Sequence, residues 1–435
     1  MTDQHELRIQ VPVLARVEGE GALDLTIRDH AIESLQLQIY EPPRLFEKFL
    51  EGRGYHEVPD LVARICGICP VAYQMSAVQA LESLYGVDPG AHIRAWRRLF
   101  YCGEWIQSHS LHIHLLAAPD FLGFDSVTAM AKRYPEEVRR GLRLQALGND
   151  IIALLGGRSV HPVGACVGGF YRLPETQEIN NIKYKVKSSY DDALALLDWT
   201  AGLALPDDRQ AFCCVALQQA GEYPMNAGRR IQSSAGLDIG AEAYEQHFEE
   251  FQLPHSTALH AGLHGQPYLV GPLARLNLSR QWLPPAVRQA LDATGIAFPS
   301  HNMLHSIVAR AAEILFAVTE AMRILEAAPD TAPARVAVQP RAGTGFGCTE
   351  APRGLLWHRY ESDDHGQIRR ARIVPPTSQN QARMEQDIRA SLEAFGLHQD
   401  AAALRLRAET VIRNYDPCIS CATHFLRLNM QRLEP

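Results

Sequence analysis

Apolar and polar residues alternate over the first 40 positions of the chain. Every second residue is apolar over 7–13, 23–27 and 35–39. A period of two is typical of strands that bury one face. We therefore expect three strands within residues 7–40, with the second and third joined at Asp29-His30. Together they would form a small antiparallel sheet.

Beyond this segment the apolar residues are spaced by three and four, which is typical of amphipathic helices. The pattern predicts long helices over about residues 70–86, 91–118, 135–155, 183–203 and 303–328, and two more before the C-terminus. The segment rich in Pro and Gly predicts loops, short strands and one helix, at 205–300 with the helix at 241–251. Residues 335–375 predict short strands.

No repeat, low-complexity tract or charged linker divides the chain. The expected fold class is therefore α+β and mostly α. It would be a single large domain with a long-helix core and small peripheral antiparallel sheets.

The bulk composition excludes several classes of protein. With 435 residues, 46% of them hydrophobic, and a net charge of −7, the chain resembles a soluble globular protein without the basic surface that nucleic-acid binding needs. No apolar run of about 18 residues is present, so no membrane span is expected. The polar start, Met1–Glu6, predicts no signal peptide. Nine cysteines with two CxxC pairs suit a reducing compartment.

The candidate chemistry lies in two CxxC motifs at opposite ends of the chain. Cys69 directly precedes Pro70, a residue type that favours the first position of a helix. Cys66 and Cys69 would therefore lie at the entry to a helix, whose N-terminus would favour thiolate over thiol. Cys418 and Cys421 lie between an acidic and an imidazole side chain, Asp416 and His424. We expect the fold to bring these two ends together around a metal.

Spacing alone leaves three interpretations open. Four thiolates fit a structural zinc site, a catalytic or redox-active site of zinc, iron, copper(I) or nickel, or a redox dithiol pair. Zinc ribbons place their pairs about 15–20 residues apart, whereas these pairs lie at opposite ends of the sequence. Glu47 and His424 could serve a separate hard cation such as magnesium.

Several other features carry weaker signals. The group His109, His112 and His114 on one long helix favours packing and proton transfer over metal binding. The segment Gly343–Cys348 lacks the third glycine of a dinucleotide loop. The remaining cysteines are scattered and predict buried packing residues: Cys102, Cys166, Cys213, Cys214 and Cys348.

Taken together, Arg64–Pro70 and Asp416–His424 resemble the two signature motifs of the large subunit of nickel–iron hydrogenases. Further matching segments follow in the expected order: Ala15–Gly19, Phe46-Glu47, Gly156–Arg158 with His161-Pro162, Glu350–Gly354 and Val374–Asn380. The run Pro70–Ala77 is most similar to the soluble, cytoplasmic NADP-linked branch, the sulfhydrogenases. In it Tyr73 stands where many relatives have His.

The resemblance implies a bimetallic centre. Nickel would be bound by all four motif cysteines, Cys66, Cys69, Cys418 and Cys421, and Cys69 and Cys421 would bridge to an iron that carries cyanide (CN) and carbon monoxide (CO). Arg353 would lie over the cluster, and Pro376 and Thr377 would contact a diatomic ligand. A second site for magnesium or iron would be formed by Glu47, a backbone carbonyl near Ile373, and His424.

The resemblance also implies catalysis and partners. H2 would be cleaved reversibly into protons and electrons, with Glu18 (or Arg353) and a Cys421 or Cys418 thiolate accepting the proton, and Asp120 and Asp416 as acidic groups around the metals. Because no further cysteine set could hold iron–sulfur clusters, electrons would leave through an iron–sulfur small subunit. Ferredoxin-like and flavin- and NAD(P)-binding diaphorase subunits would then carry them further.

Maturation is the last expectation. Residues 1–424 would form the catalytic domain, and a maturation protease would remove the tail 425–435 after nickel chaperones have loaded the metal. The branch resemblance predicts a cytoplasmic enzyme. Two other interpretations stay open: a nickel-free relative within a respiratory-type complex, and a structural zinc protein with four cysteine ligands.

Overall fold

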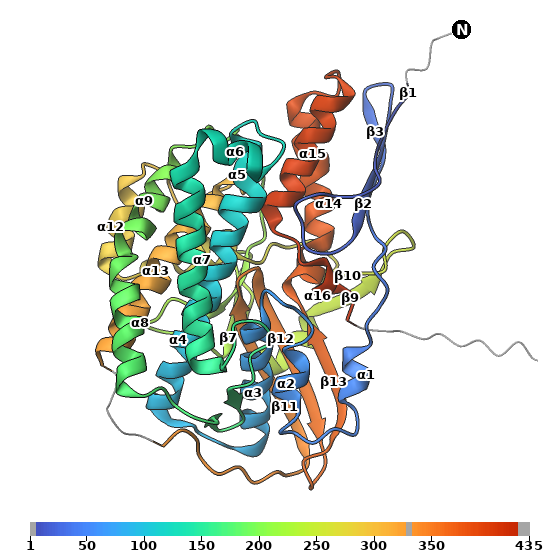
Figure 1. The fold of residues 1–435 in the computed structure, drawn as a ribbon. Helices are drawn as coiled ribbons and strands as arrows, with labels where there is room; N and C mark the ends of the chain where they lie inside the picture. The colour runs from blue at the N-terminus through green and yellow to red at the C-terminus, as the bar shows by residue number, and fades with distance from the viewer. Residues whose placement is uncertain (1–5, 328–332, 425–435) are drawn as a thin grey trace, which may run out of the picture.

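The computed structural model describes residues 6–327 and 333–424. On one side of the molecule a layer of long helices packs side by side (Figure 1). Its members are α4 (Gly90–Leu111), α7 (Pro135–Gly156), α8 (Thr176–Ser188), α9 (Tyr190–Ala201), α12 (Pro285–Ala293) and α13 (Ser306–Glu326). This layer is the predicted long-helix core.

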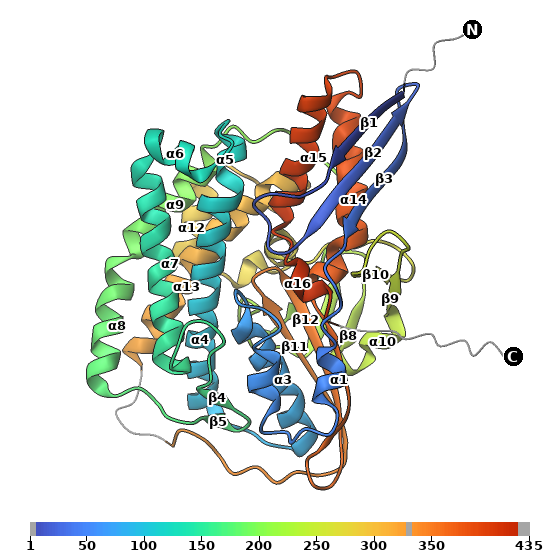
Figure 2. The same cartoon turned by 45° about the vertical axis from the view of Figure 1, so that its right-hand side comes forward.

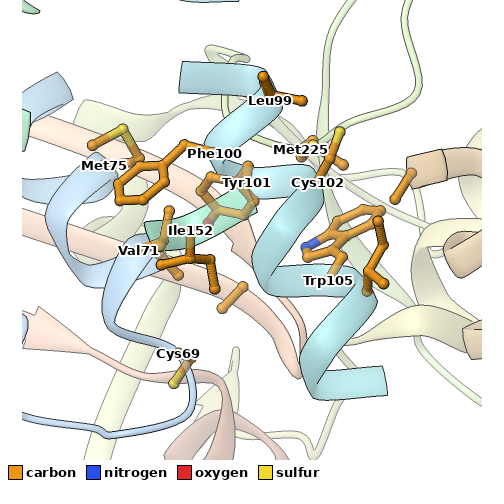
Figure 3. Close-up of a cluster of buried hydrophobic side chains, with 14 of the residues drawn as sticks. Cys69, Val71, Met75, Leu99, Phe100, Tyr101, Cys102, Trp105, Ile152 and Met225 are labelled. Atoms are coloured by element: carbon orange, nitrogen blue, oxygen red, sulfur yellow. The ribbon is translucent and has the colours of Figure 1, made fainter. Parts of the chain in front are cut away.

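The middle of α4 is buried on every face and forms the centre of the hydrophobic core. Phe100, Tyr101 and Trp105 are each fully buried there. Figure 3 shows Phe100 and Tyr101 above Val71, Trp105 to their right, and Cys69 at the lower edge of the same cluster. The apolar core of the helix layer therefore extends to one of the two cysteine motifs.

The two larger of the three three-stranded antiparallel sheets in the described chain lie on the opposite side (Figure 2), and the third is formed by the short strands β6–β8, within residues 215–240. The first consists of β1 (Glu6–Val11), β2 (Gly21–Arg28) and β3 (Ala31–Ile39), as the alternation predicts. Asp29 and His30 both take positive φ, 49° and 63°, which fits a tight hairpin turn. The second sheet consists of β11 (Gly343–Ala351), β12 (Gly354–Ser362) and β13 (Ile368–Val374).

Smaller elements complete the fold, and several of them, such as β10 (Leu259–Leu263), are buried. Short antiparallel strands are β4 (Ala165–Cys166), β5 (Gly169–Phe170), β6 (Val215–Gln218), β7 (Arg230–Ser233), β8 (Asp238–Gly240), β9 (Phe248–Gln252) and β10 (Leu259–Leu263). Short helices are α1 (Phe46–Leu50), α2 (Val58–Val62), α5 (Ala118–Phe121), α6 (Val127–Arg133), α10 (Tyr244–His247) and α11 (Pro272–Ser279). Within the described ranges, no helix combines the length and apolarity needed to cross a bilayer.

Three expected helices differ from the prediction. The segment 183–203 is divided at Ser189 into α8 and α9. The helix from 91 becomes π-helical over His112–Ala117 and restarts as α5, because Pro119 has no N–H to continue an α-helical ladder. The helix expected at 241–251 is wrong: only α10 is α-helical, and β9 follows because its backbone pairs with β10.

The cysteine motifs lie where these layers meet. Cys69 directly precedes α3 (Pro70–Tyr85), which packs against β11 and β12. From the other end of the chain, α14 (Pro376–Phe395) and α15 (Ala401–Tyr415) lead to the short α16 (Ile419–Ala422). In Figure 2 α16 lies between α14 and the sheet β11–β13. The tail 425–435 lies outside the described residues, so its removal stays a prediction.

Close packing of α4 on α7 gives a test of the fold. A Cβ added at Gly148 of α7 would lie 2.5 Å from the Gln107 nitrogen and the Gly103 oxygen of α4. We expect Gly148→Ala to lower the free energy of unfolding by about 1–3 kcal/mol, the usual cost of overpacking. Helix propensity alone would instead raise it by about 1 kcal/mol, so the sign of the change decides.

Denaturant unfolding followed by circular dichroism measures this difference. The control Ala146→Ser adds one atom at an exposed position of the same helix and should change stability by less than about 0.5 kcal/mol. A Gly148→Ala protein as stable as the wild type would contradict the close contact.

Candidate metal centre

Four buried cysteine sulfurs meet at the junction of the two chain ends. Cys66 Sγ lies 3.3 Å from Cys418 Sγ, and Cys69 Sγ lies 3.7 Å from Cys421 Sγ, although 352 residues separate the members of each pair. All four sulfurs lie within 4.8 Å of one another, and none of the residues is more than 3% exposed. The predicted convergence of the two CxxC motifs is therefore present.

The N-terminal motif is held at the start of α3. Cys66 Sγ accepts hydrogen bonds from the backbone N–H groups of Ile68, at 3.3 Å, and Cys69, at 3.4 Å. The first turn of the helix is capped by Glu104 of α4, whose carboxylate accepts from Val71 N at 2.6 Å and Ala72 N at 3.0 Å. Glu104 is fully buried. The one sequence signal for its role is that this acidic residue lies in a helix between apolar residues.

The C-terminal motif is held by the loop that contains Glu18. Ile419 N donates to the backbone oxygen of Glu18 at 3.0 Å, and Ser420 N donates to Glu18 Oε2 at 3.1 Å. Gly19 makes this close approach possible, because it has a φ of +91° and an added Cβ would lie 2.6 Å from Ile419 Cβ. Glu18 is therefore placed beside the motif as the sequence predicts.

Arg44 joins the two motifs directly. Its guanidinium donates to the backbone oxygen of Ile65 at 2.7 Å and to that of Ser420. One guanidinium therefore donates hydrogen bonds to two carbonyls, each adjacent in sequence to a motif cysteine. The sequence contains no signal for this role except that Arg44 precedes the matching pair Phe46-Glu47.

Arg353 and Asp416 form a buried ion pair at the centre. Arg353 lies in the two-residue turn between β11 and β12 and donates to the Asp416 backbone oxygen at 2.7 Å and to Oδ1 at 3.0 Å. Both side chains are 2% exposed. Within the described residues, Arg353 Nη1 and Asp416 Oδ2 are buried without a hydrogen bond. A buried guanidinium nitrogen of this kind calls for an acceptor.

Thr377 and Tyr73 also face the cysteines. Pro376 begins α14, and the next residue, Thr377, accepts a hydrogen bond from Cys418 N at 3.1 Å. The Tyr73 hydroxyl is buried without a hydrogen bond in the described part of the chain. Burial, together with the neighbouring Cys421 and Cys69, raises the pKa of Tyr73 well above its ordinary value, so the phenol stays protonated.

The protonation of the centre follows from burial and from the mutual contacts of its groups. Hydrogen bonds from the other thiols, first Cys418, lower the pKa of Cys66 well below that of a free cysteine. Burial raises the pKa of Cys418 well above it. Burial and the charge on Cys66 also raise the pKa of Glu18. A carboxyl with a raised pKa can exchange a proton with a neighbouring thiol.

The three groups expected at a second cation site also meet. His424 Nε2 lies 2.7 Å from the Ile373 backbone oxygen and 3.6 Å from Glu47 Oε1. Ile373 N donates to the same Glu47 oxygen at 2.8 Å. Glu250, which the sequence did not single out, is buried nearby; burial raises its pKa, and it also senses the charges of Glu47 and His424.

Asp120 is not brought to the cysteines by any contact in the described residues. Its carboxylate binds Arg413 at 2.7 and 3.1 Å and also pairs with Arg16. Arg16 precedes Glu18 by two residues and Arg413 precedes Asp416 by three. Asp120 thus ties together the two segments that carry these acids, and a direct catalytic role remains a prediction.

The three helix histidines point to different partners. His109 pairs with Glu313 at 2.9 Å, His112 with the Arg413 oxygen at 2.8 Å, and His114 with the Ser110 oxygen at 2.9 Å. Burial lowers the pKa of His109 and of His114 to about 4, so both are neutral. Within the described residues they form no shared metal site, which favours the packing interpretation.

Comparison with known proteins agrees with this geometry. The model of the nickel-dependent hydrogenase family matches residues 44–140 and 259–424, more than half of the chain. The sulfhydrogenase 1 subunit alpha of Pyrococcus furiosus is 32% identical over 97% of this chain and 99% of its own length. The NAD-reducing hydrogenase HoxS subunit beta of Cupriavidus necator is 28% identical over 96% of this chain and 95% of its own.

The fold also matches a solved structure. An NAD+-reducing nickel–iron hydrogenase in its H2-reduced state superimposes with a TM-score of 0.85 at 27% identity, covering 96% of this chain and 99% of that one. The sequence relatives and the solved structure each cover nearly the whole chain, and the family model covers more than half of it. The chain therefore belongs to the nickel-dependent hydrogenase family, as the large subunit of a nickel–iron hydrogenase, an oxidoreductase that acts on H2.

Proposed function

We propose that the four-cysteine group holds nickel and iron and is the place where this subunit splits H2 heterolytically. The observation that carries the proposal is the set of four buried sulfurs within 4.8 Å of one another. Thiolates are the preferred protein ligands of soft metals. When bound, nickel and iron would supply the redox-active centre at which H2 is polarised. The alternatives of a nickel-free relative and a structural zinc site lack support from the matches to hydrogenases.

The residues around the sulfurs fit an iron with diatomic ligands. Cys69 and Cys421 would be shared by both metals, and Arg353 Nη1 is a buried donor that lacks a protein acceptor in the described chain. A cyanide ligand is an acceptor of suitable charge, and Pro376 and Thr377 at the start of α14 would contact a second diatomic ligand. This assignment of CN and CO rests on the donors that face the centre.

Proton transfer is assigned to Glu18. Its carboxylate accepts a hydrogen bond from Ser420 N at 3.1 Å, and it lies close enough to Cys66 and Cys418 for both thiols to affect its pKa. Because burial raises its pKa, Glu18 can receive a proton from a cysteine thiol and pass it on. Asp416 orients Arg353 through a two-point contact and is a positioning residue.

A magnesium ion is proposed at the second site. Glu47 would provide a carboxylate oxygen, Ile373 its backbone oxygen and His424 a ring nitrogen. The first two are the oxygen ligands that magnesium prefers. Such an ion would fix the C-terminal residue of the described chain next to β13. Removal of residues 425–435 by a maturation protease, after loading by nickel chaperones, would leave His424 as the terminus.

The electron acceptor is proposed from the relatives. The matching proteins include a subunit of a sulfhydrogenase and a subunit of an NAD-reducing hydrogenase. We infer an iron–sulfur small subunit as the direct partner, with ferredoxin-like and flavin-containing diaphorase subunits passing electrons to NAD(P) in the cytoplasm.

Metal analysis tests the centre itself. The wild-type chain should contain about one nickel and about one iron, with infrared bands from cyanide and carbon monoxide, and Cys421→Ser should lose both metals because a shared thiolate ligand is removed. Cys213→Ser, at a half-buried cysteine outside the group, is the matched control and should retain them. Zinc alone in the wild type would overturn the proposal.

Replacing the proton acceptor separates chemistry from metal binding. Glu18→Gln keeps the shape of the side chain, so metal content and infrared bands should stay unchanged while H2-oxidation activity falls by about 10²-fold or more. Glu20→Gln, two residues away on the surface, should behave as wild type. Normal turnover of Glu18→Gln would remove Glu18 from the proton path.

The close approach at Gly19 should decide whether the motif closes. Gly19→Ala places a Cβ against Ile419, and we expect nickel content to fall severalfold as Glu18 and Cys418 are pushed apart. Gly52→Ala is matched in backbone strain, with φ of +80°, but its added Cβ meets no atom within 4 Å. An equal loss of nickel in the two variants would show that backbone strain, and not the contact with Ile419, lowers the nickel content.

A further inference from the structure

A second group of potential metal ligands lies outside the four-cysteine centre and outside the Glu47–His424 site. His255 precedes β10, His260 lies within β10, and Glu385 lies on α14. The three side chains join the hairpin β9–β10 to α14. One ligand atom from each lies within 4.8 Å of the others. Nothing in the proposed hydrogenase chemistry uses them.

The separations fit a single ion. His255 Nε2 lies 2.9 Å from Glu385 Oε1, and His260 Nε2 lies 3.8 Å from Glu385 Oε2. Two ligands bound about 2.1 Å from a tetrahedral zinc lie about 3.4 Å apart, between these two values. Small rotations of the side chains are therefore enough to place an ion between them.

Hydrogen bonds and packing contacts orient the side chains of this group, as is usual for metal ligands. The backbone N–H of Leu37 in β3 donates to Glu385 Oε1 at 3.0 Å and so fixes the carboxylate. The His260 ring stacks on Phe251, with centroids 5.7 Å apart and an interplanar angle of 25°. Such contacts orient ligands around bound metals.

His260 is the independent sign of a missing ligand. It is fully buried, and in the described chain neither of its ring nitrogens makes a hydrogen bond. A buried imidazole without hydrogen bonds is destabilising unless something else binds it. Its Nε2 lies 3.8 Å from Glu385 Oε2. This distance is too long for a hydrogen bond but suits two atoms that bind the same ion.

We propose that His255, His260 and Glu385 bind a divalent transition-metal ion of the zinc class, with solvent as the fourth ligand. Two imidazoles and one carboxylate are a known zinc ligand set that leaves one position open. The side chains of His255 and Glu385 are 16% and 17% exposed, so solvent has access to that position.

The ion would stabilise a segment that packs against the C-terminal cysteine motif. Ala258 lies between the two histidines in sequence and packs against Ile419 and Ala422 of α16. Next to it, Thr257 donates to the backbone oxygens of Ile39 and Glu41. An ion that fixes the hairpin β9–β10 to α14 would thus also fix the segment around Ala258, which packs against the C-terminal cysteine motif.

The experiment uses the full, nickel-loaded chain. It is incubated with Zn²⁺, freed of loose metal by gel filtration, and measured for zinc content and for X-ray absorption at the zinc edge. We expect about one zinc per chain, with nitrogen and oxygen ligands at about 2.0–2.2 Å and no sulfur at about 2.3 Å. His255→Ala and Glu385→Gln, at partly exposed positions, should each lower zinc content at least about tenfold.

The control addresses adventitious binding at a neighbouring histidine pair. His247 and His264 lie 3.4 Å apart near the surface of the same hairpin. His264→Asn, which tolerates the φ of +50° at this position, should retain zinc. Loss of zinc in His264→Asn alone would identify a surface site, and sulfur ligands or no retained zinc would also overturn the proposal. A circular dichroism spectrum that matches the wild type would show that the His255 and Glu385 variants are folded.

Discussion

The contact of four thiols from the two ends of the chain is the constraint on which the rest of the structure depends. Groups from the N-terminal part hold the C-terminal motif in place: Arg44 binds carbonyls beside both motifs, and Glu18 accepts a hydrogen bond from the backbone after Cys418. Ordering such distant segments costs conformational entropy, which packing of the helix layer must offset. The cysteines therefore meet only when the whole domain is folded, and a metal bound by all four would report complete folding.

Burial of charge is the second physical theme of the centre. Arg353 and Asp416 share two hydrogen bonds, yet one side-chain atom of each remains buried without a partner in the described chain. Arg310 lies close enough to Arg353 and Asp416 to interact with both charges. Burial lowers the pKa of Arg310 to about 10, and the charge of Asp416 opposes this change. Charges placed in this way around soft sulfurs would be costly in an inert scaffold, since each unpaired group carries a desolvation penalty. They suit a site whose ligands and protons change during turnover.

The sequence predicted this site better than the fold around it. Paired cysteines, alternation in β1–β3 and a proline at the start of α3 are local signals, and the structure confirms them. Glu104, Arg44 and Glu250 were missed because their roles depend on which backbone groups and charges lie opposite in space. Local preference predicts a helix at β9, but in the structure the pairing of β9 with β10 outweighs that preference. Asp120 forms ion pairs with Arg16 and Arg413, two contacts that no local sequence pattern indicates, and its role near the metals stays a prediction.

The central claim is that both cysteine motifs bind one nickel atom together. X-ray absorption at the nickel edge of the intact chain measures its ligands directly. We predict a first shell of sulfur atoms, about four of them, with a heavier scatterer from iron beyond. A first shell of nitrogen and oxygen, or of only about two sulfurs, would mean that the motifs do not share the metal and would contradict the account.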